Sequence, residues 1–207
     1  YFIPDLIKKR FGGANLDLFF KGVMKFDKNE FKKIGEEYQK KMNKISNNSE
    51  RSTDKLPINF LSIGFIRLIL PNSKIIHCKR NPRDTIFSIY KNHFPSGRVT
   101  FGYDLSELVD YYNFYYDLML YWNKILPNFI YNINYENLIS DTENQIKNLL
   151  NYSNLDWQDD CLKFYNNKRA IKTASDTQVR NKIYTSSINS WKNYNQYFKK
   201  DFAKLER

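Results

Sequence analysis

The chain alternates between apolar segments with helical spacing and a short segment typical of a strand. Residues 28–46 place apolar side chains along one helical face, and Asp27 before them is a good N-cap. Residues 58–70 repeat the helical spacing and end at a Pro-Asn-Ser turn. Residues 74–79 predict a strand, which leads directly into a helix to about residue 92.

The second half of the chain repeats this order of elements. Asp104 begins a capping pattern for a long aromatic helix that ends before Pro127, and residues 129–134 predict a second strand. Alternating strands and helices are typical of βαβ units. We therefore expect a helix-rich α/β fold in which helices flank a parallel sheet.

Two further helices are predicted after the second strand. Ser140 begins a capping box for a helix to Tyr152, and Asp156 is expected to cap a helix over residues 157–165. No internal repeat, low-complexity tract or long linker divides the chain. The economical interpretation is a single domain over residues 1–207.

Composition narrows the classes of protein and partner. Lys and Arg number 33 against 22 Asp and Glu, a net charge of +11, which favours a negatively charged partner. A content of 42% hydrophobic and 17% aromatic residues excludes a disordered chain. No apolar run approaches the length of about 18 residues that spans a bilayer, so no transmembrane segment is expected.

The two cysteines, Cys78 and Cys161, lie far apart and form no CxxC pair. This spacing argues against a disulfide scaffold and against a structural zinc site. Unpaired cysteines suit a reducing compartment, so a cytoplasmic location is expected if the protein is bacterial.

The sequence Arg80-Asn81-Pro82-Arg83 between a strand and a helix predicts an anion site. Asn81 is a good N-cap, Pro82 suits the first helical position, and Asp84 adds negative charge to the first turn. A helix N-terminus exposes unpaired backbone N–H groups, and Arg80 adds a forked donor beside them. Ser88 adds a hydroxyl if its side of the helix faces the ligand. The alternative, in which Arg80 pairs with a nearby carboxylate and Ser88 only packs, stays open at this point.

Other candidate residues carry less specific signals. Lys55 precedes Leu56-Pro57, and proline restricts the residue before it, so the lysine ammonium is either held toward developing negative charge or is solvated. Residues 173–182 are rich in hydroxyls and amides and form either a ligand-facing or a solvated loop. His77 is expected to be a hydrogen-bonded core histidine, and His93 either a base or a cation at a helix end.

Taken in order, several segments resemble the sulfotransferase family. They are residues 54–60, residues 71–90, Tyr135-Glu136-Asn137-Leu138, residues 155–164 and residues 173–194. The resemblance is closest to a bacterial branch similar to tyrosylprotein sulfotransferases. It covers a cofactor-binding core at about residues 54–194, and residues 1–53 form a helical segment before it.

The resemblance implies transfer of a sulfuryl group from 3′-phosphoadenosine 5′-phosphosulfate (PAPS) to an acceptor hydroxyl on a peptide, a carbohydrate or a small molecule. The implied fold is similar to P-loop kinases, and no metal is implied. By position, Lys55 corresponds to the catalytic lysine, and Arg80 and Ser88 hold the nucleotide 3′-phosphate. Tyr135 lies near the adenosine. The residues expected to close over the phosphates or the base are Ser175, Thr177, Gln178 and Arg180.

The chain also departs from the family pattern. In the family, a strand, a Gly- and Ser/Thr-rich phosphosulfate loop and a helix precede the matched region, and this chain has no such loop. The general base of the closest branch also lies upstream, so none is assigned here. Ser190 precedes Trp191, where the family often has a basic residue. We therefore expect the natural protein to extend further at its N-terminus.

Two other functions remain as alternatives at this point. A non-catalytic nucleotide-binding module of the same fold is favoured if the natural protein also lacks the phosphosulfate loop. A nucleic-acid-binding protein is suggested by the net charge of +11, although the charges are dispersed and no recognition motif occurs. The sequence predicts no oligomeric state and no particular acceptor.

Overall fold

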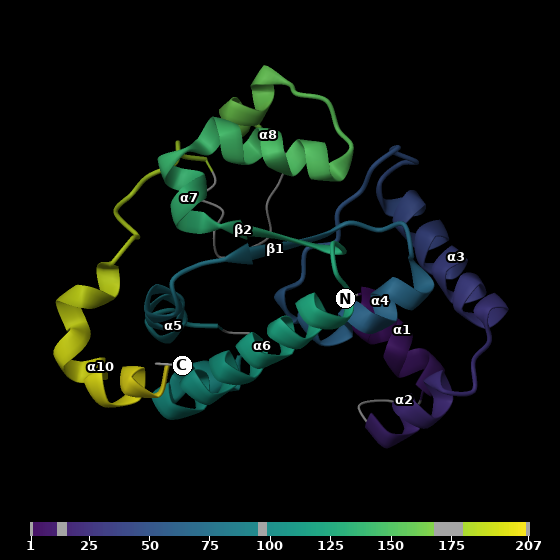
Figure 1. Ribbon diagram of the computed structural model, residues 1–207, viewed down its shortest axis with the longest axis horizontal. Helices are drawn as coiled ribbons and strands as arrows, with labels where there is room; N and C mark the ends of the chain where they lie inside the picture. Colours follow the sequence, from purple (N-terminus) through teal and green to yellow (C-terminus); the bar gives the residue numbers. More distant parts are fainter. Residues whose placement is uncertain (1, 12–15, 95–98, 168–179, 206–207) are drawn as a thin grey trace. The chain divides into compact units, whose positions relative to one another are not determined.

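The computed structural model describes residues 2–11, 16–94, 99–167 and 180–205 (Figure 1). The chain forms two compact units. One unit comprises Tyr1–Ser73 and Leu118–Trp122, and the other comprises Lys74–Asp117 and Asn123–Arg207. Helix α6 (Leu105–Ile125) therefore contributes residues to both units.

The first unit is helical in its described residues. Its elements are α1 (Phe2–Phe11), α2 (Leu16–Val23), α3 (Lys28–Ile45), the 3₁₀ helix η1 (Pro57–Ser62) and α4 (Ile63–Ile69). A capping box starts α3: the Glu30 N–H donates to Asp27 Oδ1 at 2.8 Å, and the Asp27 N–H donates to Glu30 Oε2 at 3.1 Å. The predicted helix and its N-cap are confirmed.

The buried side of α3 packs against helix α4. Ile34, Tyr38 and Met42 are buried at helical spacing. Gly35 lies among them, and a Cβ atom at this position would meet the Ile69 carbonyl oxygen at 1.9 Å. Only a residue without a side chain allows the two helix backbones to approach so closely.

The second unit contains two parallel strands, β1 (Ile75–Lys79) and β2 (Ile130–Asn134), paired from Ile75↔Ile130 to Lys79↔Asn134. The connection between them includes α5 (Pro82–Tyr90), the 3₁₀ helix η2 (Thr100–Tyr103) and α6. Parallel strands require such a crossover, because a tight turn joins only antiparallel neighbours. The predicted α/β class with a small parallel sheet is therefore confirmed.

Different helices cover the two faces of this sheet, α6 on one and α8 (Thr142–Ser153) on the other (Figure 1). On one face, His77 is hydrogen-bonded to Asn132 of β2 and to Tyr115 of α6. On the other face, Tyr131 stacks on Tyr152 of α8, with ring centroids 5.0 Å apart. The period of two along a strand explains this division.

The core of the second unit joins the crossover helices to the C-terminal elements. These elements are η4 (Ser190–Tyr194), α10 (Asn195–Phe202) and η5 (Ala203–Leu205). The buried cluster consists of Ile86, Phe87, Leu108, Val109, Trp191, Phe198 and Phe202. The C-terminal segment is thus fixed against the helix that begins directly after β1.

Two predicted helix starts are wrong. Ser140 does not begin a capping box, because it is the last residue of a helix that the sequence did not predict, α7 (Tyr135–Ser140), and its Oγ donates to the Asn137 carbonyl at 3.2 Å. Asp156 caps no helix, since the next element is the 3₁₀ helix η3 (Asp159–Asn166), which follows Gln158. Polar residues at a helix end resemble those at a helix start, and this similarity caused the first error.

Two predictions concern the chain as a whole: the absence of a transmembrane segment and the number of domains. Among the described residues, no helix has both the length and the apolar character needed to cross a bilayer. The organisation as a single domain over residues 1–207, with a cofactor-binding core at about residues 54–194, stays a prediction.

Gly35→Ala should destabilise the first unit by about 1–3 kcal/mol, as overpacking of a tight contact does. The clash with a backbone oxygen cannot be relieved by a side-chain rotation, and it outweighs the better helix propensity of alanine. Chemical denaturation followed by circular dichroism measures the change. Lys40→Ala, at an exposed position of the same helix, is the control and should change stability little. An equal stability of both variants would contradict the close approach.

His77 should make the stability of the second unit depend on pH. Burial lowers the pKa of His77, the charge of Lys79 adds to this effect, and the hydrogen bond to Asn132 opposes it. Below about pH 6.5, His77 is therefore protonated in the unfolded chain but stays neutral in the folded chain. The free energy of unfolding consequently falls as the pH falls.

The measurement is the slope of unfolding free energy between pH 7 and pH 5. This slope should be smaller in His77→Gln than in the wild type, whatever the absolute stability of the variant. The chain has two histidines, and the other, His93, is exposed. His93→Gln should keep the wild-type slope. A wild-type slope in His77→Gln would rule out the proposed cause.

Candidate functional site

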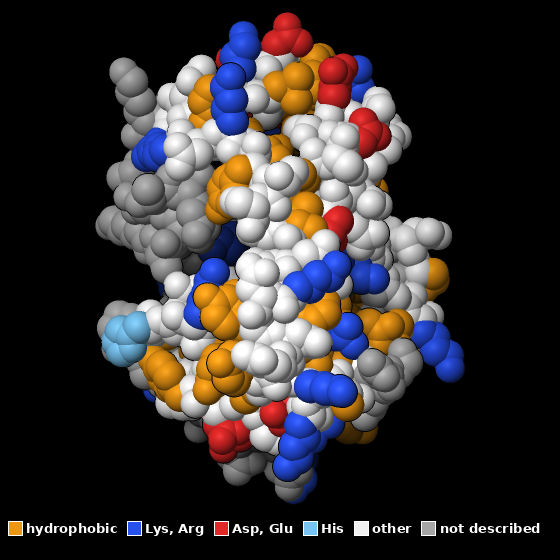
Figure 2. Space-filling view, turned by 90° about the vertical axis from the view of Figure 1, so that its left-hand side faces the viewer, with side chains coloured by type: hydrophobic (Ala, Val, Ile, Leu, Met, Phe, Trp, Pro, Cys, Tyr) orange, Lys and Arg blue, Asp and Glu red, His pale blue; other side chains and the backbone are white. Residues whose placement is uncertain are grey.

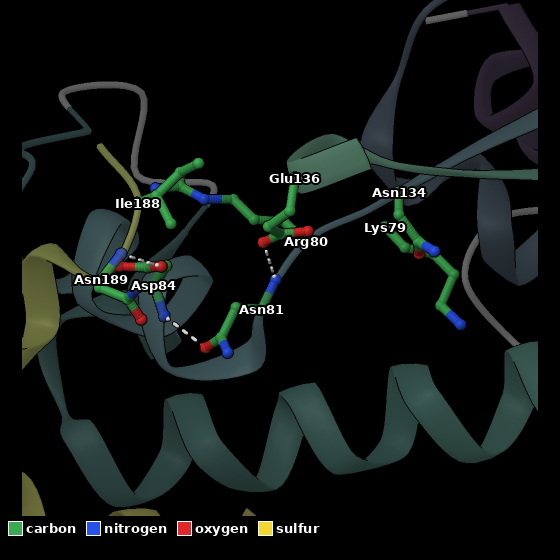
Figure 3. A pocket seen from close by; sticks show the side chains of 8 residues that line it. All are labelled: Lys79, Arg80, Asn81, Asp84, Asn134, Glu136, Ile188 and Asn189. Carbon is green, nitrogen blue, oxygen red and sulfur yellow. Dashed lines mark hydrogen bonds between the residues drawn. The ribbon is translucent and has the colours of Figure 1, made fainter. Parts of the chain in front are cut away.

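A cavity lies at the carboxyl ends of the two parallel strands (Figure 3). The last pair of the register is Lys79↔Asn134, so the residues that follow, Arg80-Asn81 and Tyr135-Glu136, come together there. The cavity has a volume of about 330 Å³ and is lined by Lys79, Arg80, Asn81, Asp84, Asn134, Glu136, Ile188 and Asn189. Ligands of open α/β sheets bind at this edge, outside the carboxyl ends of the strands.

Arg80 crosses the cavity toward Ile188 (Figure 3). Its Nη2 donates to the Ser187 carbonyl at 2.6 Å, and its guanidinium carbon lies 5.1 Å from the centroid of the Tyr135 ring. The Tyr135 hydroxyl is 3.1 Å from Ser187 Oγ. The structure therefore brings together two of the predicted site residues, Arg80 and Tyr135.

The Nε atom of Arg80 is buried and has no hydrogen-bond partner among the described residues. Within the same residues, no carboxylate forms an ion pair with Arg80, so the alternative of an arginine–carboxylate pair is wrong there. A buried donor without an acceptor is costly. Arg80 thus keeps a donor for an acceptor that a bound anion would supply.

The backbone N–H groups at the start of α5 are already engaged. The Asn81 side-chain oxygen accepts from the N–H groups of Arg83 and Asp84 at 2.9 and 3.3 Å, and the Thr85 N–H donates to the Asn81 carbonyl. Pro82 has no N–H. The prediction of Asn81 as N-cap is confirmed, but the prediction of free N–H donors for an anion is wrong, because the cap itself uses them.

Glu136 completes this arrangement from the first turn of α7, directly after β2. Its Oε1 accepts the Asn81 N–H at 2.8 Å, which links the end of β2 to the start of α5. The cavity lining accordingly contains two cations, Lys79 and Arg80, and two acids, Asp84 and Glu136. A balanced lining creates little net field, so selectivity for an anion here depends on the placement of Arg80 rather than on bulk charge.

On the face that Figure 2 shows, the positive charge of the described residues is dispersed. Figure 2 shows Lys and Arg side chains separated by neutral and hydrophobic surface over the face in view, without one continuous basic stripe on that face. The excess charge of the chain is therefore not gathered there as a nucleic-acid groove would require.

The remaining predicted binding residues lie elsewhere or are not described. Ser88 is partly buried on α5 and is not among the residues that line the cavity. Arg180 is partly buried. Ser175, Thr177 and Gln178 lie outside the described residues. Among those that are described, no three His, Cys, Asp or Glu side chains gather as a metal site would require.

Lys55 belongs to the first unit, where its neighbours are restrained on both sides. The Tyr38 hydroxyl donates to Asp54 Oδ2 at 2.9 Å. Leu56 is extended, with φ −139° and ψ 117°, and its carbonyl accepts the Asn59 N–H at 3.0 Å. Burial, followed by the bond to Asp54, raises the pKa of Tyr38, which therefore stays a neutral donor. Leu56 thus has the extended conformation expected before Pro57, and Lys55 itself is exposed, so the direction of its ammonium stays a prediction.

Sequence reasoning missed several residues of the cavity. Asp84 was expected only to add negative charge to the first helical turn, yet its side chain is 0% exposed and accepts the Asn189 N–H at 2.8 Å. Ser187 and Asn189 lie within the segment 173–194 that resembles the family, but no role was predicted for either residue. Glu136 was recognised within a motif without a role, although its place directly after a predicted strand could have indicated one.

Comparison with known proteins adds two findings. The sequence profile described as the sulfotransferase family matches residues 25–159. An uncharacterized protein of Aquifex aeolicus (strain VF5) is 36% identical over 193 residues, which cover 89% of this chain and 25% of that protein. The chain therefore spans about a quarter of the length of this relative.

Proposed function

Because the chain belongs to the sulfotransferase family, we propose that the protein transfers a sulfuryl group from PAPS to an acceptor hydroxyl, and that the cavity at Arg80 binds the 3′-phosphate of this nucleotide. The acceptor is a hydroxyl of a peptide, a carbohydrate or a small molecule. The branch similar to tyrosylprotein sulfotransferases stays part of this proposal.

The observation that carries the proposal is the state of Arg80. Its guanidinium lies at the carboxyl edge of a parallel sheet, in a cavity, with a buried Nε that has no acceptor among the described residues. A phosphate oxygen would supply that acceptor, and guanidinium groups bind phosphate through paired, charge-assisted hydrogen bonds. The residues present therefore fit a phosphate group.

Other roles in nucleotide binding rest on the resemblance to the family. Tyr135 would contact the adenosine, and its ring beside Arg80 is in keeping with this role. Ser88 would share the 3′-phosphate. The residues that would close over the nucleotide are Ser175, Thr177, Gln178 and Arg180.

In the proposed reaction, the acceptor oxygen forms a bond to sulfur, the bond from sulfur to the oxygen of the 5′-phosphate breaks, and the hydroxyl proton passes to a base. Lys55 would hold its ammonium toward the oxygen that gains negative charge as this bond breaks. Such a group accelerates the reaction when it is already oriented, and hydrogen bonds of Asp54 and Leu56 restrain the residues on either side of Lys55. No described residue is assigned as the base.

Arg80→Ala should weaken binding of 3′-phosphoadenosine 5′-phosphate by about 1.5–3 kcal/mol, the value of a charge-assisted hydrogen bond. Binding of adenosine 5′-phosphate should hardly change, because this nucleotide lacks the 3′-phosphate. Isothermal titration calorimetry with both nucleotides measures the difference. Arg51→Ala, which removes an exposed arginine of the other unit, is the control. Equal losses for the two nucleotides would refute the 3′-phosphate assignment.

Lys55→Ala should lower kcat by about 10²–10³-fold, the range for removal of one stabilising donor. The dissociation constant of 3′-phosphoadenosine 5′-phosphate should change much less, since the charge that Lys55 stabilises develops in the transition state. Steady-state turnover of the full-length protein and calorimetry separate the two effects. Lys33→Ala, at an exposed position of α3, is the control. Weaker nucleotide binding with an unchanged kcat would exclude the proposed role.

A further inference from the structure

Asp84 is a fully buried carboxylate at the start of α5. Its side chain is 0% exposed, and no Lys, Arg or His forms an ion pair with it among the described residues. Burial of a carboxylate without a cation is expensive and is tolerated only when hydrogen bonds satisfy its oxygens. Hydrogen bonds to the two oxygens of Asp84 must therefore offset the cost of its burial.

Both carboxylate oxygens hold one short segment of the C-terminal region. Oδ2 accepts the Asn189 N–H at 2.8 Å, and Oδ1 accepts from Ser190 Oγ at 3.3 Å. Asn189 has a left-handed backbone with φ 59° and ψ 17°, a conformation that non-glycine residues rarely adopt. The bond to Asp84 stabilises this turn, which begins η4.

The segment held in this way forms one wall of the cavity. Ile188 and Asn189 line it, and Ser187 gives its carbonyl to Arg80 and its hydroxyl to Tyr135. Among the described residues, no hydrogen bond or ion pair joins Asp84 to Arg80, although both side chains line the cavity. Its effect on the guanidinium therefore passes through the positions of Ser187 and Asn189.

The residue that follows this turn, Trp191, belongs to the buried core of the second unit. Trp191 is 8% exposed, its ring lies 4.9 Å from the Arg83 guanidinium carbon, and it packs edge to face on Phe202. The wall is thus fixed at Asp84 on one side and at Trp191 on the other. A guanidinium held against a fixed wall can distinguish ligands that differ by one phosphate.

We propose that Asp84 is a positioning residue that sets the selectivity of the Arg80 cavity for a 3′-phosphate by holding residues 187–190 in place. This inference rests on the proposed function, because it takes the nucleotide 3′-phosphate as the ligand. It adds a residue whose hydrogen bonds go to Asn189 and Ser190 rather than to Arg80.

The test compares Asp84→Ala with Asp84→Asn in the full-length protein. Alanine leaves the Asn189 N–H without its acceptor, whereas the asparagine oxygen still accepts it and the amide can donate to Ser190 Oγ. The preference for 3′-phosphoadenosine 5′-phosphate over adenosine 5′-phosphate, measured by calorimetry, should fall about tenfold in Asp84→Ala, equivalent to about 1.4 kcal/mol. Asp84→Asn should recover most of the preference.

Asp104→Ala is the matched control for loss of a carboxylate. Asp104 Oδ1 accepts the Glu107 N–H at 2.9 Å at the start of α6, so its removal breaks a comparable bond outside the cavity lining. This variant should lose stability but keep the wild-type nucleotide preference. Hydrogen exchange of the Asn189 amide should accelerate in Asp84→Ala and not in Asp104→Ala.

The outcomes separate this inference from the proposed function. A wild-type protein without preference for the 3′-phosphate overturns both. A wild-type preference that Asp84→Ala retains, or that Asp84→Ala and Asp84→Asn lose equally, overturns the positioning role alone. If Asp84→Ala does not fold by circular dichroism, Ser190→Ala replaces it. Ser190→Ala removes the longer of the two bonds to Asp84 together with the 3.4 Å bond from Ser190 Oγ to the Ser187 carbonyl. It should lower the preference about threefold, and an unchanged preference would again overturn the role.

Discussion

The parallel pairing of β1 with β2 is the constraint on which the candidate site depends. The register ends at Lys79↔Asn134, so each strand delivers its next two residues to the same edge. Antiparallel pairing would send one of these ends to the opposite edge, and Arg80 would not meet Tyr135. The Glu136–Asn81 bond then joins the two strand ends directly, and helix α5 starts from that point.

The lining of the cavity favours selection of a ligand by geometry rather than by net charge. The cap formed by Asn81 and the carboxylate of Glu136 use the backbone donors that would otherwise attract any anion. Two acids balance the two cations of the lining. A ligand therefore gains little from being negative alone and gains most when it meets the guanidinium in one orientation, which favours specificity over affinity.

Local patterns in the sequence predicted the elements that carry the site but not their partners. The strand before Arg80, the N-cap at Asn81 and the long helix after Asp104 are local features, and the structure contains each of them. Asp84, Ser187 and Asn189 act through contacts across more than a hundred positions, for which spacing gives no signal. The unpredicted helix α7 and the misplaced start at Ser140 show the same limit at short range, since polar residues serve both helix ends.

Arg80 and Ser187 are 107 positions apart in the chain, yet they share a hydrogen bond inside the cavity. Contacts between such distant positions require closure of a long loop. They form slowly during folding because the chain loses the entropy of loop closure before the new contacts stabilise it. A ligand of this cavity therefore recognises only the completely folded second unit and raises its stability by mass action. It follows that a substitution that lowers the folded fraction weakens the apparent affinity in proportion to that loss, even when it lies far from the cavity.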